Sequence, residues 1–143
     1  MAFQVEFVSP EEILYSAVAI QVVARTRGGG EIAFLTGHEP FIGSLVPSEV
    51  RVYEEDGSIR RFAVRGGFVS VTGTVAETKV TVLSDAAVPA DSINRTAVQA
   101  ELAEAQAALA ADPEDSYLQD DVRWAEVRLR TSDAGAATAQ SAH

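Results

Sequence analysis

The chain has 143 residues and a mass of 15.2 kDa, and 47% of its residues are hydrophobic, which fits one compact domain, or one domain carrying a small appendage. Its 11 basic and 21 acidic residues give a formal net charge of −10, so nucleic acids and anionic membranes would be repelled on average. The absence of cysteine excludes disulfide frameworks, thiolate nucleophiles and cysteine-based metal sites, and the presence of only two histidines, His38 and His143, removes most histidine-ligated metal sites.

The first residues do not resemble a targeting segment, because residues 1–8 lack a basic region and Glu6 falls where an apolar run would be needed. The longest apolar run, 17–24, is interrupted by Gln21 and is far shorter than the roughly 20 residues that a membrane span requires. We therefore expect a protein that is soluble or peripheral to something else.

Residues 3–88 contain short apolar runs rich in β-branched residues, separated by glycine, proline and Asp-Gly, a pattern typical of many short strands. The clearest element is a hairpin in which residues 50–53 and 59–64 alternate around Asp56-Gly57. Further strands are expected at 13–24, 31–35, 41–46, 68–72 and 79–83. Their close spacing predicts a β-sandwich or flattened barrel over residues 1–88.

Residues 89–130 differ in composition, since glycine disappears until Gly135 and Ala, Glu, Gln and Leu predominate, which predicts helices. Two series of apolar residues share the same spacing of four, three and four residues, so each would lie on one face of a helix: Val98, Leu102, Ala105 and Leu109, then Leu118, Val122, Ala125 and Leu129. The short connection between them predicts an antiparallel helical hairpin. The expected fold class is therefore α+β, an N-terminal antiparallel β-sandwich or flattened barrel followed by this hairpin.

The helix ends carry capping signals. Asp91 or Ser92 is expected to cap the first helix, which Asp112-Pro113 would end, and Asp115 or Ser116 to cap the second. The contact between the two helices consists mostly of alanine and leucine and so buries little apolar area. Because burial contributes about 25 cal/mol per Å², the hairpin should be only marginally stable unless it docks on something larger. We therefore expect it to be movable. The tail, 131–143, has no periodicity and is expected to be disordered.

Four ordered motifs carry a family likeness: Val8-Ser9-Pro10-Glu11, residues 30–40, residues 62–68 and residues 80–86. Together they resemble the epsilon subunit of the F-type ATP synthase, over about residues 3–130. The chain departs from that family's pattern at Ala33, where glycine is usual, and at Thr36, where proline is frequent.

The resemblance implies a non-catalytic rotor subunit of the central stalk, which couples proton translocation to ATP synthesis while the chemistry occurs elsewhere. It implies that the β domain binds the gamma subunit and the c-ring, and that the helices can extend toward the alpha and beta subunits and restrain ATP hydrolysis. The implied location is peripheral, on the cytoplasmic face of a bacterial cell membrane, reached only through the complex.

The resemblance also suggests interface residues in the β domain. The loop that contains Gly37, His38 and Pro40 would face gamma, and Glu31 would lie near the polar loops of the c-ring. Without the resemblance, His38 is simply a turn residue with a satisfied imidazole, and Glu31 a solvated charge at the start of a strand.

Three arginines cluster in the last helix, at Arg123, Arg128 and Arg130. They could compensate the helix dipole, or they could meet acidic segments of the beta subunit when the hairpin extends, as basic residues of that family's last helix do. Arg123 and Arg130 are seven residues apart and so share a face. Trp124 lies outside the apolar spacing of the second helix. It could cover an edge of the hairpin, anchor the hairpin against gamma, or simply pack.

Some members of the family bind ATP through an Ile/Leu-Asp-x-x-Arg-Ala motif at the start of the first helix. The corresponding stretch, residues 93–98, has Asn94 in place of the acid and Ala97 in place of the arginine, while Arg95 stands two positions too early. We therefore expect no tight ATP site and no cofactor.

Two other classes of function remain as alternatives. A small-molecule-binding sandwich with a helical accessory would need an apolar pocket with convergent polar groups inside the β domain. A hydrolase would have to combine His38 with a carboxylate such as Glu39 or Asp85, and the chain offers no nucleophile elbow beside them.

Overall fold

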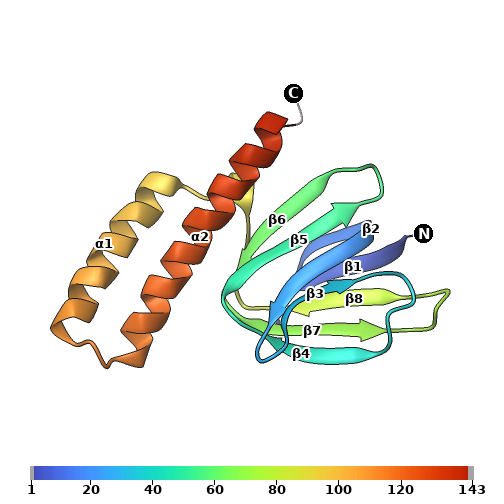
Figure 1. Cartoon of the computed structure of the whole chain (residues 1–143), viewed down its shortest axis with the longest axis horizontal. Helices are drawn as coiled ribbons and strands as arrows, with labels where there is room; N and C mark the ends of the chain where they lie inside the picture. The colour runs from blue at the N-terminus through green and yellow to red at the C-terminus, as the bar shows by residue number, and fades with distance from the viewer. Residues whose placement is uncertain (1, 142–143) are drawn as a thin grey trace.

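The computed structural model describes residues 2–141, with side chains up to residue 136. In this part of the chain nine strands precede a short 3-10 turn and two helices (Figure 1). The strands are β1 (Phe3–Val8), β2 (Ile13–Thr26), β3 (Gly30–Phe34), β4 (Phe41–Leu45), β5 (Ser48–Glu54), β6 (Ile59–Val64), β7 (Gly67–Thr72), β8 (Lys79–Leu83) and β9 (Ala87–Pro89). They are followed by η1 (Ala90–Ser92), α1 (Arg95–Ala111) and α2 (Ser116–Ser141).

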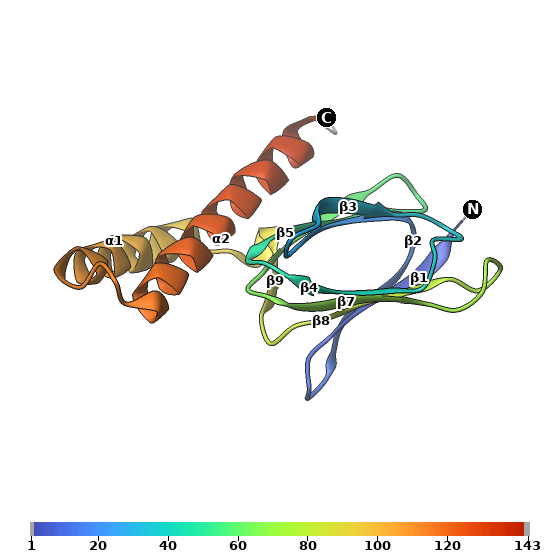
Figure 2. The ribbon, with the colours of Figure 1, turned by 60° about the horizontal axis from the view of Figure 1, so that its bottom comes forward.

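The strands form a flattened barrel of two layers, which Figure 2 shows edge-on. One layer has the order β1-β8-β7-β4, and the other contains β3, β2, β5, β6 and β9. The long strand β2 belongs to both, because its first half pairs with β1 and its second half with β3 and β5. The predicted α+β fold is thereby confirmed, with one exception to the antiparallel pattern: β1 and β8 are parallel.

Alternation along the strands places every second side chain between the two layers. Four phenylalanines, Phe3, Phe7, Phe34 and Phe62, fill the core together with valines. The buried valines are Val5, Val22, Val50, Val52, Val64, Val69, Val71, Val80 and Val82. The hairpin predicted around Asp56-Gly57 is confirmed as β5 and β6, in which Val52 lies opposite Arg60.

Helix α2 packs against the β domain, whereas α1 packs chiefly against α2 and projects away from the sheet (Figure 1). Trp124 and Val127 of α2 form a small buried cluster with Ala63 of β6. Ala86, Val88 and Ile93 line the edge of this cluster. The hairpin therefore rests on the β domain through one face of one helix.

The expectation of a disordered tail after Arg130 is wrong for the described residues, because α2 continues as a helix to Ser141. Thr131 is completely buried, and Gly135 approaches Ala90 of η1 so closely that an added Cβ would lie 2.7 Å from its methyl group. This contact supports a segment whose composition is otherwise only moderately helix-forming. Residues 142–143, including His143, lie outside the described residues.

The caps were predicted correctly at one helix and incorrectly at the other. Asp115 caps α2, since its Oδ1 accepts hydrogen bonds from the N–H groups of Tyr117 (2.9 Å) and Leu118 (3.2 Å). Neither Asp91 nor Ser92 caps α1, because both belong to η1 and the chain turns again before the helix begins.

Candidate functional site

The loop between β3 and β4 brings three of the predicted interface residues together. The N–H of Gly37 donates to Thr78 Oγ1 (3.0 Å), and Gly37 has a positive φ of 84°, so the loop is tied to the β7–β8 connection. The half-buried His38 packs edge-on against Phe34, with ring centroids 4.9 Å apart. Pro40 is exposed beside them. The segment that joins β3 to β4 lies at the end of the barrel away from the helices (Figure 1).

Glu31 lies at the opposite end of β3, about 13 Å of extended chain away from the start of that loop. Its carboxylate accepts a hydrogen bond from Arg51 Nη2 (2.9 Å) and lies 3.6 Å from Arg25 Nη2. The ion pairs continue across the sheet, because Arg51 and Arg61 both contact Glu49. The structure therefore does not bring Glu31 together with Gly37, His38 and Pro40.

The three arginines of α2 are also divided. The guanidinium of Arg128 stacks 5.1 Å above the Trp124 ring, and its Nη2 donates to Glu101 of α1 (2.6 Å), so it holds the two helices together. Arg123 and Arg130 are exposed, and within the part of the chain that the structure describes no carboxylate pairs with them. Only these two remain available to another protein.

The fold creates a surface that the sequence analysis missed, which we call the apolar stripe: Ile42, Phe68, Leu83, Val8 and Ile13. Phe68 lies directly opposite Leu83, Leu83 opposite Val8, and Val8 opposite Ile13. Ile42 is the diagonal neighbour of Phe68, since it pairs with Ser70. The stripe thus crosses the outer face of one layer without interruption.

Large side chains in the stripe face solvent. Ile42 is 73% exposed, Phe68 48% and Leu83 46%, although their strand neighbours Val69 and Val82 are completely buried. A contiguous exposed apolar surface is typical of interaction sites. The signal in the sequence was the presence of bulky apolar residues at both phases of the alternation in β7 and β8.

Gly67 explains how Phe68 reaches this surface. Its φ is 115°, and an added Cβ would lie 1.9 Å from the carbonyl oxygen of Leu83, so only glycine lets β7 and β8 meet there. A groove of about 340 Å³ lies beside this contact, and it is bordered by Arg65, Phe68, Leu83 and Asp85. The Gly66-Gly67 turn between β6 and β7 is therefore where the stripe begins on β7.

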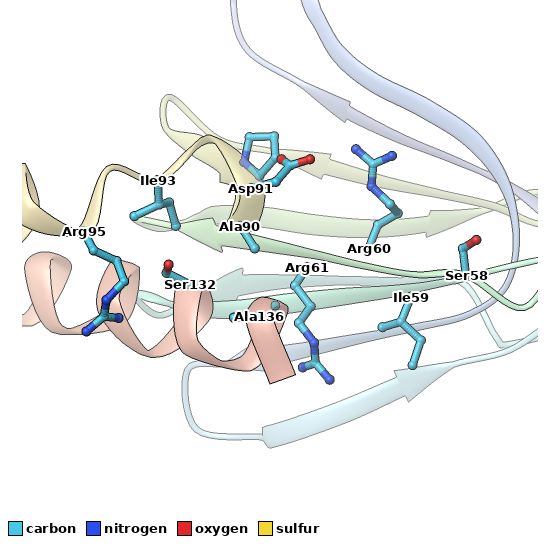
Figure 3. A pocket seen from close by; sticks show the side chains of 12 residues that line it. Ser58, Ile59, Arg60, Arg61, Ala90, Asp91, Ile93, Arg95, Ser132 and Ala136 are labelled. Atoms are coloured by element: carbon cyan, nitrogen blue, oxygen red, sulfur yellow. The ribbon is translucent and has the colours of Figure 1, made fainter. Parts of the chain in front are cut away.

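A cavity of about 710 Å³ lies between β6, η1 and the helices rather than inside the barrel (Figure 3). Arg60 and Arg61 point to opposite sides of β6, as Figure 3 shows. Arg61 is paired with Glu49, and Arg95 with Asp133 of α2. The small-molecule alternative needs a pocket with convergent polar groups inside the β domain, and this cavity does not lie there.

The hydrolase alternative is not supported by the geometry either. His38 Nδ1 lies 2.8 Å from the backbone carbonyl oxygen of Glu39. Asp85 follows the far end of β8, so about 20 Å of extended strand separates it from the end of the barrel that holds His38. These groups do not form an acid–base pair.

Asn94, which replaces the acid of the ATP motif, has a structural task here. Its Oδ1 accepts a hydrogen bond from the N–H of Ala97 (3.1 Å) and caps α1. We expect Asn94→Ala to lower the free energy of unfolding by about 1 kcal/mol, because the first turn loses its cap. Asn94→Asp should remain close to the original stability. Urea unfolding followed by circular dichroism measures both, and equal losses would contradict the capping role.

No helix within residues 2–141 is long and apolar enough to cross a bilayer. Residues 2–90 match the family model of the beta-sandwich domain of the ATP synthase delta/epsilon chain. The ATP synthase epsilon chain of Sinorhizobium fredii is 37% identical over 108 residues, which cover 76% of this chain and 77% of that one. The epsilon chain of Thioalkalivibrio sulfidiphilus is 37% identical over 134 residues, covering 91% and 92%.

The likeness extends to a solved structure. A chain in the cryo-EM structure of the Euglena gracilis mitochondrial ATP synthase, which contains OSCP, F1 and the c-ring, superposes with a TM-score of 0.68. The match is 23% identical and covers 95% of this chain and 80% of that chain, so it shows a shared fold that includes the helices.

Proposed function

Because the chain belongs to the family of ATP synthase epsilon chains, we propose that it is a non-catalytic subunit of the central stalk that couples proton translocation to ATP synthesis. Relatives that match over nine tenths of their length support a role for the whole chain, helices included. The protein would be peripheral, held on the cytoplasmic face of a bacterial membrane by the complex.

The observation that carries the proposal is the apolar stripe, because a subunit without chemistry of its own must act through surfaces. We assign the stripe to the gamma subunit, since an exposed run from Ile42 to Ile13 is complementary to an apolar face of a partner. The loop with Gly37, His38 and Pro40 would extend this contact. Glu31, at the other end of β3, would contact the c-ring through its polar loops.

The hairpin is the regulatory part of the proposal. Among the described residues it rests on the β domain chiefly through α2, so it can leave without disturbing the core of the barrel. Arg123 and Arg130 are exposed already and share a face, which suits contact with acidic segments of the alpha and beta subunits once the hairpin extends. Arg128 would join them only after it releases Glu101.

The test is ATP hydrolysis by the reconstituted synthase. We expect a chain ending after Ser92, which keeps all strands from β1 to β9, to raise hydrolysis several-fold, and Arg123→Ala with Arg130→Ala to do so in part. Arg27→Ala, an exposed arginine of the β domain, is the matched control and should leave the rate unchanged. If the shortened chain assembles and the rate does not change, the protein couples without inhibiting.

A further inference from the structure

The hairpin is built as one body. Arg128 of α2 donates to Glu101 of α1, and Arg95 of α1 bonds both Asp133 and the carbonyl oxygen of Leu129 in α2. These contacts lie within the hairpin and do not depend on the β domain. What holds this body on the barrel is therefore a separate question.

Two kinds of contact answer it. The apolar one consists of Trp124 and Val127 packed on Ala63, with Gly135 fitted against Ala90 of η1 farther along α2. A polar contact is made by Arg65, which follows β6: its Nε and Nη2 donate to Asp120 Oδ2 (3.1 and 2.8 Å), and Nη2 also donates to Asp121 Oδ1 (2.9 Å). Charge-assisted hydrogen bonds of this kind are stronger than neutral ones.

The two sides of this contact are positioned by different parts of the chain. The N–H of Arg65 donates to the carbonyl oxygen of Ala86 (3.1 Å), and the following Gly66-Gly67 turn fits closely against β8, so Arg65 stays with the barrel. Asp120 and Asp121 precede Trp124 by four and three residues and thus lie on the same face of α2. Separation of hairpin and barrel must break all three hydrogen bonds.

We infer that Arg65, Asp120 and Asp121 form an electrostatic latch that sets the docked fraction of the hairpin and opens as ionic strength rises. The side chains are 43%, 40% and 49% exposed, so mobile ions can reach them. Such pairs have modest energies, which suits a balance between two states. The latch rests on the proposed regulatory hairpin, but it is tested on the isolated chain, so its failure is distinct from a failure of the proposed inhibition of ATP hydrolysis.

The chain contains its own reporter, because Trp124 is the single tryptophan and lies buried in the docking contact. In the full chain, we expect Trp124 emission to move to longer wavelength between about 0.01 M and about 1 M NaCl, over which the Debye length falls from about 30 Å to about 3 Å. Arg65→Ala should raise the ratio of undocked to docked hairpin about five-fold at low salt and remove most of the salt response.

Asp120→Asn with Asp121→Asn should reproduce this effect from the other side of the latch, without touching the barrel. Arg27→Ala removes an exposed arginine of the β2–β3 turn, for which no ion pair is found among the described residues; it is the matched control and should behave as the original chain. Reversal of the charges, with Arg65→Asp, Asp120→Arg and Asp121→Arg together, should restore docking. Restored docking would show that position 65 interacts directly with positions 120 and 121, because a general effect of net charge would not depend on which side carries which sign.

A second readout does not depend on tryptophan. The chain has no cysteine, so Glu55→Cys on the β5–β6 turn and Glu104→Cys on α1 take spin labels at those two positions alone. Arg65→Ala should add a population at longer label–label distance. If both readouts stay as in the original chain, or if Arg27→Ala shifts them equally, the latch is wrong.

Discussion

Phe68→Asp combined with Leu83→Asp is expected to weaken binding to the gamma subunit by more than about 100-fold. The two side chains lie directly opposite each other in the centre of the apolar stripe, and each is about half exposed. Two carboxylates buried against an apolar partner would lose hydration without gaining ion pairs, a cost of about 3 kcal/mol or more.

The measurement is titration of labelled gamma with the purified chain, and it needs a control for charge. Thr72→Asp with Gln4→Asp adds the same two charges at exposed positions of the same layer, outside the stripe, and should change the dissociation constant by less than about three-fold. Thermal unfolding of both variants should stay near that of the original chain. Equal loss of affinity in the two double variants would show that the apolar stripe does not contact gamma.

Alternation and turn chemistry were sufficient to predict most of the fold. The β5–β6 hairpin could be read from Asp56-Gly57 between alternating runs, and α2 from Asp115 and its apolar spacing. The start of α1 was misplaced because Asp91 and Asn94 both have capping side chains, and a turn between them decides which one is used. Burial of Thr131 and the fit of Gly135 against Ala90 are tertiary contacts, so composition alone placed the end of α2 too early.

The functional surfaces were harder to predict, because they depend on which strands become neighbours. The stripe unites Val8 with Leu83 through the parallel pairing of β1 and β8, at a separation of 75 residues that no local pattern encodes. The latch joins Arg65 to Asp120 across 55 residues for the same reason. Conversely, Glu31 and His38 are close in sequence yet lie at opposite ends of β3, because an extended strand carries its ends apart.

Trp124→Ala is expected to shift the hairpin from docked to released by more than about 100-fold. Trp124 is buried against Ala63 together with Val127, and removal of a buried aromatic side chain costs about 3–5 kcal/mol. Spin labels at Glu55→Cys and Glu104→Cys measure the shift without tryptophan. Tyr117→Ala is the control, since that aromatic ring is 83% exposed at the start of the same helix; an equal shift there would contradict the anchoring role.

The same substitution separates two roles of the hairpin in the assembled synthase. If the docked state is the permissive one, Trp124→Ala frees the hairpin to extend, and ATP hydrolysis should fall, whereas the chain that ends after Ser92 has no hairpin and should raise it. Both variants remove the docked hairpin, yet their effects should have opposite signs. A rise in hydrolysis with Trp124→Ala would instead mean that this side chain stabilises the extended state, with the tryptophan anchoring the hairpin against gamma.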